Sequence, residues 1–409
     1  MTKFKHITLK TLPVYKTNYG EAYCGDALVL LKELPSESID LVMTSPPFAL
    51  QRQKEYGNLD QETYVDWLLQ FTTEIKRVLK NTGSFVLDIG GAYLKSRPVR
   101  SLYNYRVLIR LCDEQGWNLA EEFFWYNPAK LPSPIEWVNK RKIRAKDAVN
   151  TVWWLSKSDF PKANISQVLA PYSERMKKLL EDSEKYYLPK DRPSGHQISS
   201  SFSRDNGGAI PSNLLQIPNT ESNSQYLRFC KIADVQGHPA RFPEKLPEFF
   251  IKFLTDENDL VLDIFAGSNT TGAVAEKLGR KWLAFEQEKK YLAASVFRFV
   301  PNNQEKIGPL FESILRQNSE GIRLENSSQL QLLESKAEYG KSVPKKRKSL
   351  KNSKITNLEI TLEIETGNLI YKKVNTLEEL AKFAKEHADN PKKILEKITP
   401  KKRSKKITE

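Results

Sequence analysis

Strand-like and helix-like segments alternate along this chain, and that alternation limits its possible folds more than any other feature. The run "SIDLVMT" (38–44) is short and apolar, which is typical of a strand buried on both faces of a parallel sheet. Apolar residues then recur at spacings of three and four from Val65 to Leu79, which predicts an amphipathic helix. Alternation of this kind predicts an α/β fold with a parallel, doubly wound sheet.

Two stretches of the chain carry this pattern. In the first, "SFVLDIGG", "LAEEFFWYNP" and "DAVNTVWWLSKS" are predicted strands, and "YRVLIRLCDEQGW" is a predicted helix ended by Gly116. In the second, "DLVLDIF" and "RKWLAFE" are predicted strands, with helices at "LPEFFIKFL", "GAVAEKLG" and "KKYLAASVFRFV". Between them, from about 161 to 235, Ser, Asn, Pro and Gly crowd the sequence, which is typical of functional loops or disorder.

The last ninety residues have a different character. "PKKRKSLKNSK" reads as a basic linker, "NLEITLEIE" alternates as a half-buried strand does, and a capping box at Thr376 predicts a helix start. We therefore expect four parts: 1–160, 161–235, 236–315 and a basic extension over 320–409.

The charge of the chain indicates a polyanionic partner. The net charge is +14, and residues 341–409 hold 19 Lys and Arg against 9 Asp and Glu, so +10 of it lies there. Two interpretations remain open for this tail: a solvated basic segment, or an extension that contacts nucleic acid.

Composition also excludes several classes of protein. Three widely spaced cysteines without C-x-x-C, and four scattered histidines, argue against a disulfide framework and a zinc site. No run of eighteen apolar residues exists, and the N-terminus lacks an apolar signal region. We expect a cytoplasmic protein without a metal or a membrane partner.

The segment "LVLDIFAGSNTTGAVAEKLG" (260–279) has the features of a ligand-binding turn. A strand ends at Asp263, and a loop of small residues leads into a helix whose first N–H groups are free to bind a ligand. The loop is neither G-x-G-x-x-G nor a P-loop. The next strand ends at Glu286, an acid placed to hold ribose hydroxyls. The alternative is an ordinary tight turn between a strand and a helix.

The segment "TSPPF" (44–48) ends the first predicted strand. Open α/β sheets bind ligands at the carboxyl ends of their strands. Pro46 and Pro47 remove two backbone donors and fix two φ angles, so the carbonyls before them can face a cavity. Phe48 adds a flat surface beside the Ser45 hydroxyl. These residues predict a slot for a planar, hydrogen-bonding ring; a simple turn is the alternative.

These motifs resemble those of DNA amino-methyltransferases whose motifs run in permuted order, with the catalytic half first. "TSPPF" is similar to the serine-containing motif of cytosine-N4 methyltransferases, and "DIFAGSNTTG" to the S-adenosylmethionine motif, with Ser268 where a second glycine is common. "GHPARFPEKLPEFF" resembles the segment over the methionine end of the cofactor. The resemblance covers about residues 20–315 and implies a Rossmann-like methyltransferase fold, with target recognition on the insert over 161–235. The extension over 320–409 lies outside it.

The residues and the resemblance together predict three sets of site residues. The catalytic set is Ser45, Pro46, Pro47 and Phe48. The S-adenosylmethionine set is Asp26, Thr44, His238, Pro239, Phe242, Asp263, Phe265, Gly267, Ser268, Asn269, Thr270, Thr271 and Glu286. The DNA-binding set is Lys140, Arg141, Lys142, Arg144, Arg192, His196, Ser199 and Arg204; for the four basic residues 140–144, a solvated stretch is the alternative.

The expected chemistry is direct methylation of an exocyclic amine in double-stranded DNA. Ser45 Oγ and the Pro46 carbonyl would accept hydrogen bonds from the amine, and these strengthen as charge grows on nitrogen. The base must leave the helix to reach them, and Phe48 would stack on it. Trp125 and Tyr126 are candidates for the other wall. None of the three cysteines follows a proline, as the nucleophile for methylation at carbon 5 normally would.

Several alternatives stay open at this point. Adenine N6 could replace cytosine N4 as the acceptor, although such enzymes usually carry Asp or Asn in place of Ser45. A catalytically silent DNA-binding protein could keep the same fold. Within the family, the resemblance points to the palindrome CAGCTG, methylated at its inner cytosine, in a restriction–modification system. We expect the enzyme to act as a monomer.

Overall fold

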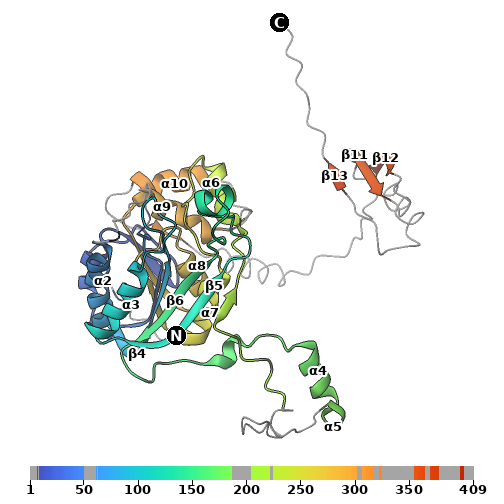
Figure 1. Ribbon diagram of the computed structural model, residues 1–409. Helices are drawn as coiled ribbons and strands as arrows, with labels where there is room; N and C mark the ends of the chain where they lie inside the picture. Colours follow the sequence, from blue (N-terminus) through green and yellow to red (C-terminus); the bar gives the residue numbers. More distant parts are fainter. Residues whose placement is uncertain are drawn as a thin grey trace, which may run out of the picture. The chain divides into compact units, whose positions relative to one another are not determined.

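The structure is a computed structural model of the whole chain. It describes residues 7, 9–49, 61, 63–186, 204–221, 224–301, 306–316, 322–324, 354–363, 369–376 and 397–399. The chain divides into two compact units, Met1–Glu334 and Ser335–Glu409 (Figure 1). Each is described by itself.

The first unit contains a sheet of ten strands in the order β10-β1-β2-β9-β8-β3-β4-β6-β5-β7. The strands are β1 (Tyr15–Lys16), β2 (Gly20–Cys24), β3 (Ile39–Thr44), β4 (Leu79–Gly90), β5 (Asn118–Tyr126), β6 (Val149–Ser156), β7 (Leu214–Gln216), β8 (Leu260–Asp263), β9 (Lys281–Glu286) and β10 (Ile322–Arg323).

The middle of this sheet is parallel, as expected, but its two sides are not. Strands β2, β9, β8, β3 and β4 run in one direction, while β6 runs antiparallel to both β4 and β5, and β1 antiparallel to β2. The expectation of a purely parallel sheet was therefore wrong at its sides. The reason is that the β5–β6 connection contains no crossover helix, and apolar periodicity does not record strand direction.

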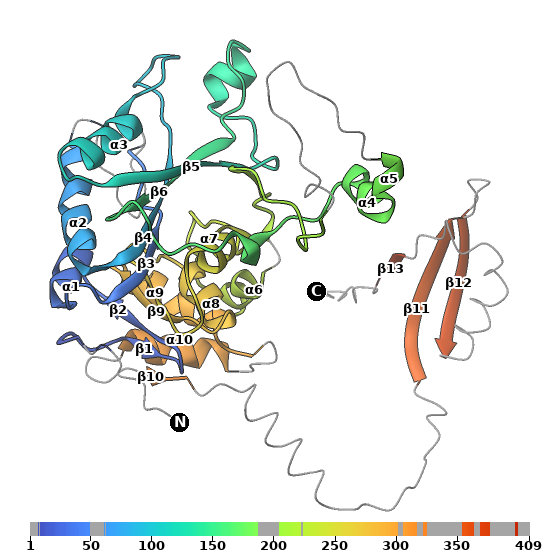
Figure 2. The same cartoon turned by 90° about the horizontal axis from the view of Figure 1, so that it is seen from below.

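Helices cover both faces of the sheet (Figure 2). One face packs against α1 (Ala27–Glu33), α2 (Tyr64–Val78) and α3 (Tyr103–Asp113). The other packs against α6 (Gln225–Ile232), α7 (Lys245–Leu254), α8 (Thr270–Lys277), α9 (Lys289–Ser295) and α10 (Ile307–Arg316). Along β3, Val42 enters the first core while Leu41 and Met43 enter the second, as the two-residue period of a strand requires.

The predicted elements of both stretches are present. The helix predicted from Val65 to Leu79 is α2, and the helix predicted to end at Gly116 is α3, where Gly116 has φ +64°. Within 161–235 the described residues form short elements: a 3-10 helix (Ile165–Val168), α4 (Glu174–Glu181), α5 (Ser183–Tyr186), β7 and α6. Strand β7 pairs with β5 and extends the sheet.

The second unit contains a three-stranded antiparallel sheet in the order β12-β11-β13. Its strands are β11 (Lys354–Glu363), β12 (Leu369–Thr376) and β13 (Lys397–Thr399). The predicted strand in "NLEITLEIE" corresponds to β11. Thr376 ends β12, and the helix predicted after it lies outside the described residues.

Candidate active site

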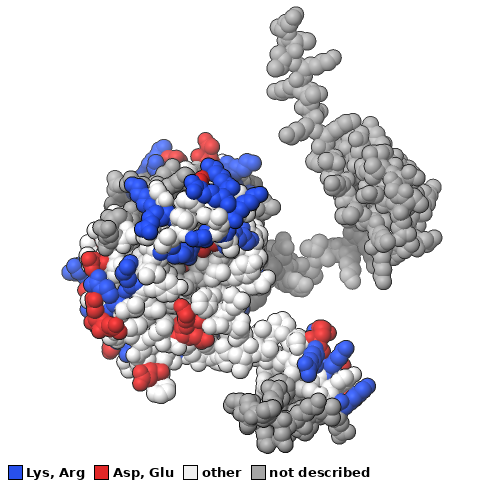
Figure 3. Space-filling model, in the orientation of Figure 1, with Lys and Arg blue, Asp and Glu red and all other residues white. Residues whose placement is uncertain are grey.

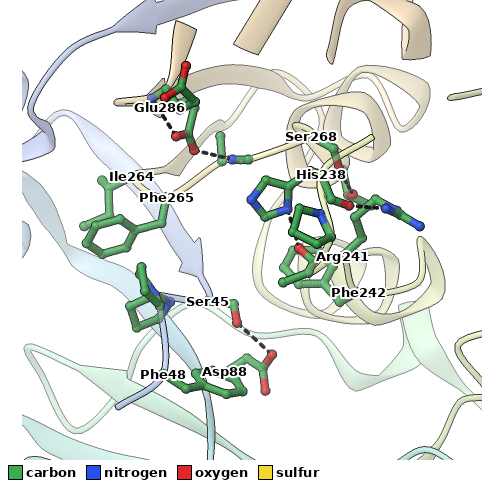
Figure 4. A pocket seen from close by; sticks show the side chains of 18 of the residues that line it. Ser45, Phe48, Asp88, His238, Arg241, Phe242, Ile264, Phe265, Ser268 and Glu286 are labelled. Atoms are coloured by element: carbon green, nitrogen blue, oxygen red, sulfur yellow. Dashed lines mark hydrogen bonds between the residues drawn. The ribbon is translucent and has the colours of Figure 1, made fainter. Parts of the chain in front are cut away.

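A cavity of about 1110 Å³ opens at the carboxyl ends of the central strands. One side is lined by residues at or just beyond the ends of β3, β4 and β5, and the opposite side by residues at or just beyond the ends of β8 and β9 (Figure 4). The lining includes thirteen of the predicted residues: Ser45, Pro46, Pro47, Phe48, Asp26, His238, Pro239, Phe242, Phe265, Gly267, Ser268, Thr270 and Glu286. The motifs of residues 44–48 and 263–272 therefore meet at one cavity, although they are more than two hundred residues apart.

Ser45 forms a hydrogen-bonded pair with a carboxylate that sequence reasoning missed. Its Oγ donates to Asp88 Oδ2 at 3.0 Å, and Asn150 Nδ2 donates to Asp88 Oδ1 at 3.1 Å. Asp88 lies near the end of β4 and Asn150 near the start of β6, and both line the cavity. Because the Ser45 proton is committed to Asp88, the lone pairs of Ser45 Oγ remain available to accept from a substrate amine.

Asp88 is a buried carboxyl with a perturbed pKa. Burial raises its pKa from 3.8 to about 6, and the hydrogen bonds from Asn150 and Ser45 partly oppose that rise. The cationic side chain of Lys130, which also lines the cavity, lowers this pKa as well. Asp88 is thus mostly ionised at neutral pH, yet basic enough to accept a proton from a neighbouring group.

Phe48 lies against a glycine that makes room for it. A Cβ added at Gly90 would lie 2.5 Å from Phe48 Cε2, so no larger residue fits there without displacing the ring. Tyr103 Oη donates a hydrogen bond to the Gly90 carbonyl and fixes this part of the strand end. Trp125 lines the cavity as expected, whereas Tyr126 does not.

The opposite side of the cavity is organised by Glu286. Its two carboxylate oxygens accept hydrogen bonds from the backbone N–H groups of Gly267, at 2.8 Å, and Glu288, at 2.9 Å. Burial raises the pKa of Glu286, while these two N–H groups lower it. Each oxygen keeps a second lone pair, so the carboxylate can also accept from the hydroxyls of a ribose.

The loop before α7 covers the glycine turn. His238 Nδ1 bonds to the Ala240 carbonyl at 2.7 Å, and the imidazole ring packs edge-on against Tyr291. A Cβ at Gly267, which has φ +52°, would lie only 3.1 Å from the His238 ring. Burial lowers the pKa of His238 to about 4, so the ring is neutral at physiological pH.

Ser268, which replaces the common second glycine, is held by an arginine. The almost fully buried Arg298 donates from Nε to the Ser268 carbonyl at 2.8 Å and from Nη2 to its Oγ at 3.1 Å. Arg298 also lies over the Tyr226 ring, 4.8 Å from its centroid. The two hydrogen bonds from Arg298 thus hold the loop at position 268, where a glycine would leave the backbone more mobile.

Four predicted cofactor residues lie behind the cavity wall. Both oxygens of the buried Asp263 are occupied: Oδ1 accepts from Thr44 Oγ1 at 2.7 Å, and Oδ2 from Thr271 Oγ1 at 2.6 Å. Asn269 adopts a left-handed conformation, and its Oδ1 accepts from Gly272 N at 3.0 Å, which caps α8. These side chains shape the cofactor loop from behind; direct cofactor contact by them stays a prediction.

The lining residues fit S-adenosylmethionine. Glu286 and the exposed Asp26, whose carboxylate caps α1, present acceptors for hydroxyl and amino groups. Phe265 presents an aromatic face that packs against Trp67, 5.6 Å between ring centroids. The cavity exceeds the upper range of about 1,000 Å³ for a single small-ligand site, so it has room for a nucleoside cofactor and a base together.

The predicted DNA contacts divide into two groups. Lys140, Arg141, Lys142, Arg144 and Arg204 are exposed, whereas Arg192, His196 and Ser199 lie outside the described residues. Two of the exposed arginines have partners within the chain: Arg141 pairs with Glu136, and Arg144 donates to the Pro98 carbonyl. On the face drawn in Figure 3, Lys and Arg also gather near α6 and α10.

The described part of the chain lacks two kinds of feature. Among the described residues, no helix is long and apolar enough to span a membrane. In the same part of the chain, no group of three or more His, Cys, Asp or Glu side chains is arranged to hold a metal ion.

Known proteins are similar to this chain in sequence, and one solved structure is similar to it in fold. The chain is 63% identical over 314 residues to the type II methyltransferase M.PvuII of Proteus hauseri, covering 76% of this chain and 93% of that one. It is 26% identical over 297 residues to the type II methyltransferase M.ScaI of Streptomyces caespitosus, covering 70% and 83%. The solved structure of the PvuII DNA methyltransferase, described as cytosine-N4-specific, aligns with a TM-score of 0.64 and 54% identity over 77% of this chain and 99% of that chain.

The predicted family and the Rossmann-like methyltransferase fold are confirmed by these likenesses. The family model described as DNA methylase, for N6 and N4 enzymes, matches residues 39–297, a span that contains both motifs and all of Ser45, Asp88 and Glu286. The chain belongs to this DNA methylase family.

Proposed function

We propose that this DNA methylase transfers a methyl group from S-adenosylmethionine to the exocyclic N4 of a cytosine that has swung out of duplex DNA. The observation that carries the proposal is the Ser45–Asp88 pair, which faces the same cavity as the Gly267 loop and Glu286. The extensive identity with a relative whose solved structure is described as cytosine-N4-specific supports the choice of acceptor.

The cofactor residues act by holding a nucleoside. Bound S-adenosylmethionine would supply an electrophilic methyl group on its sulfonium sulfur. Glu286 and Asp26 would accept from its hydroxyl and amino groups, while Phe265 would pack against the adenine. His238, neutral because its pKa is about 4, adds no positive charge beside a sulfonium. Because the methyl donor and the target amine are then held in one complex, their reaction becomes effectively unimolecular.

The catalytic side prepares the amine. Ser45 Oγ and the Pro46 carbonyl would each accept one N4–H, which turns the nitrogen lone pair toward the methyl group. Attack by this nitrogen would form the nitrogen–carbon bond while the carbon–sulfur bond of bound S-adenosylmethionine breaks and leaves its electron pair on sulfur. One N4 proton then passes to Ser45 Oγ while the Ser45 proton passes to Asp88, whose pKa of about 6 suits it to accept. No covalent enzyme intermediate is required.

The biological setting follows from the relatives that are type II methyltransferases. We propose a role in a restriction–modification system, in which methylation protects DNA from a cognate endonuclease. The palindrome CAGCTG stays a prediction of the sequence resemblance. Action as a monomer, operation without a metal and a cytoplasmic location also stay predictions from the sequence. The net charge of +14 suits a partner with a phosphate backbone.

One assay tests the proposal. Purified protein is incubated with plasmid DNA and isotope-labelled S-adenosylmethionine, and the hydrolysed nucleosides are identified by mass spectrometry, with Ser45→Ala as the control. We expect N4-methylcytosine from the wild type and at least about a 100-fold lower rate from the variant. N6-methyladenine would show that the acceptor is wrong, and an absence of methylation would favour a silent DNA-binding protein. Protection from an endonuclease that cuts CAGCTG tests the target site separately.

A further inference from the structure

Leu131, an exposed apolar residue, directly follows a residue that lines the catalytic cavity. The connection between β5 and β6, residues 127–148, contributes Asn127 and Lys130 to the cavity lining. The next residue, Leu131, has 81% of its surface exposed, and Ile135 has 60%. In Figure 2 this connection rises from the ends of β5 and β6 and carries the short helix η1 (Glu136–Lys140). A large, exposed apolar side chain thus directly follows a residue that lines a site that must receive a DNA base.

Hydrogen bonds hold this connection in shape. Asn127 Oδ1 accepts from the backbone N–H groups of Ala129 and Asn219, both at 3.1 Å. Lys146 Nζ donates to the carbonyls of Pro128, at 3.0 Å, and Lys130, at 3.2 Å. These bonds involve each of residues 127–130, which directly precede Leu131. The exposure of Leu131 therefore comes from a braced loop and not from an unsupported one.

The connection that carries the exposed leucine is positively charged. Residues 127–148 contain six Lys and Arg against two Asp and Glu, so the connection carries 6 − 2 = +4. Four of the cations lie on or just beyond η1: Lys140, Arg141, Lys142 and Arg144. A partner that offers both phosphates and a space for an apolar side chain fits this surface. Duplex DNA with one base removed from its stack is such a partner.

We propose that Leu131 inserts into the DNA stack at the gap left by the flipped target base, while the cations of residues 140–144 hold the flanking phosphates. This inference rests on the proposed function, because it requires a base to leave the helix. Extruding a base costs stacking and pairing, and proteins that distort DNA fill such gaps with apolar wedges. Leu131 neighbours Lys130, which lines the cavity, so the wedge and the receiving pocket would act on adjacent positions of one strand.

The test compares Leu131→Ala with Leu12→Ala on two duplexes. Leu12 is also exposed, at 59%, and precedes β1 at the other side of the sheet from β5. One duplex carries the mapped methylation site with the target cytosine paired to guanine. The other carries the same cytosine opposite an abasic site, where little pairing opposes its extrusion. Methylation is followed as kcat/KM on each duplex, and thermal melting confirms that both variants are folded.

The proposal expects a specific pattern of rescue. Leu131→Ala loses at least about 10-fold in kcat/KM on the paired duplex and recovers to within about 3-fold of the wild type on the abasic duplex. Leu12→Ala matches the wild type on both. An equal loss of Leu131→Ala on both duplexes, or no loss on the paired one, overturns the proposal. Wild-type protein that forms no N4-methylcytosine on either duplex would instead refute the proposed function.

Discussion

Asp88→Asn should affect activity and stability in opposite directions. The substitution replaces the ionisable carboxyl with an amide of nearly the same size, which can keep a hydrogen bond to Ser45. Activity should fall by about 100-fold or more, because an amide cannot accept the proton that leaves N4. Stability at pH 8 should rise, because the wild type keeps a charge at a position where only 2% of the side chain reaches solvent.

The size of the expected stability change follows from the pKa of Asp88. In the fold the carboxyl binds its proton more tightly, with a pKa of about 6 against an ordinary value of 3.8. The protonated carboxyl therefore stabilises the fold fully below pH 3.8, and this contribution to the free energy of unfolding is lost as the pH rises through 6. The difference between these two pKa values corresponds to about 3 kcal/mol, which Asp88→Asn should recover at pH 8 but not at pH 4.

Two measurements check this reasoning. Urea unfolding at pH 4 and pH 8 gives the stability difference, and kcat/KM between pH 5 and pH 9 gives the titration. Wild-type activity should rise with pH around an apparent pKa of about 6, and the variant should lack that rise. Asp40→Asn is the control: Asp40 is buried but pairs with Lys80 at 2.7 Å away from the cavity lining, so this variant should lose stability and keep the pH profile. An Asp88→Asn enzyme with the wild-type rise in activity would refute the role assigned to Asp88.

Three further perturbations follow from the contacts described above. Asp263→Ala leaves the hydroxyls of Thr44 and Thr271 without their acceptor and should lower the free energy of unfolding by about 3 kcal/mol in urea titrations; a change below about 0.5 kcal/mol would contradict this. Gly90→Ala places a Cβ 2.5 Å from the Phe48 ring and should cut kcat/KM by about 10-fold, and unchanged kinetics would mean that Phe48 does not hold the base. Truncation after residue 319 removes the tail that carries most of the net charge and should reduce the slope of log Kd for DNA against log salt; an identical slope would show that the tail does not touch phosphate.

Local pattern was sufficient to predict the elements that end at the cavity. The strand before Ser45, the strand that ends at Asp263 and the strand that ends at Glu286 all lie where their apolar runs indicated. The reason is physical: a strand buried on both faces must be apolar along its length, and a polar residue at its end then marks the ligand-binding edge. Sequence reasoning succeeded wherever one segment carried its own signal.

It failed where the signal depends on a distant partner. Asp88 ends the apolar run "SFVLD" much as Asp263 ends "LVLD", so a signal of the same kind was present. What distinguishes the two acids is their partners: Asp88 meets Ser45, 43 positions away, and Asn150, 62 positions away, on an antiparallel strand. The Arg298 clamp on Ser268 likewise joins α8's loop to residues beyond α9. No periodicity within a window of ten or twenty residues encodes such contacts.

The bond between Thr44 and Asp263 shows why the permuted order of the two halves does not disturb the site. Strand β3 pairs in parallel with β8, with Leu41 opposite Val261, so the strand ends are neighbours whichever strand comes first in the chain. The 2.7 Å bond from Thr44 to Asp263 then joins the residue before Ser45 to the residue that opens the cofactor loop. A shift of either motif along its strand would break this buried bond, which costs free energy because both groups would lose their partners. The distance between the predicted catalytic and cofactor motifs is thus fixed by sheet register and one buried hydrogen bond, and not by the connection between them.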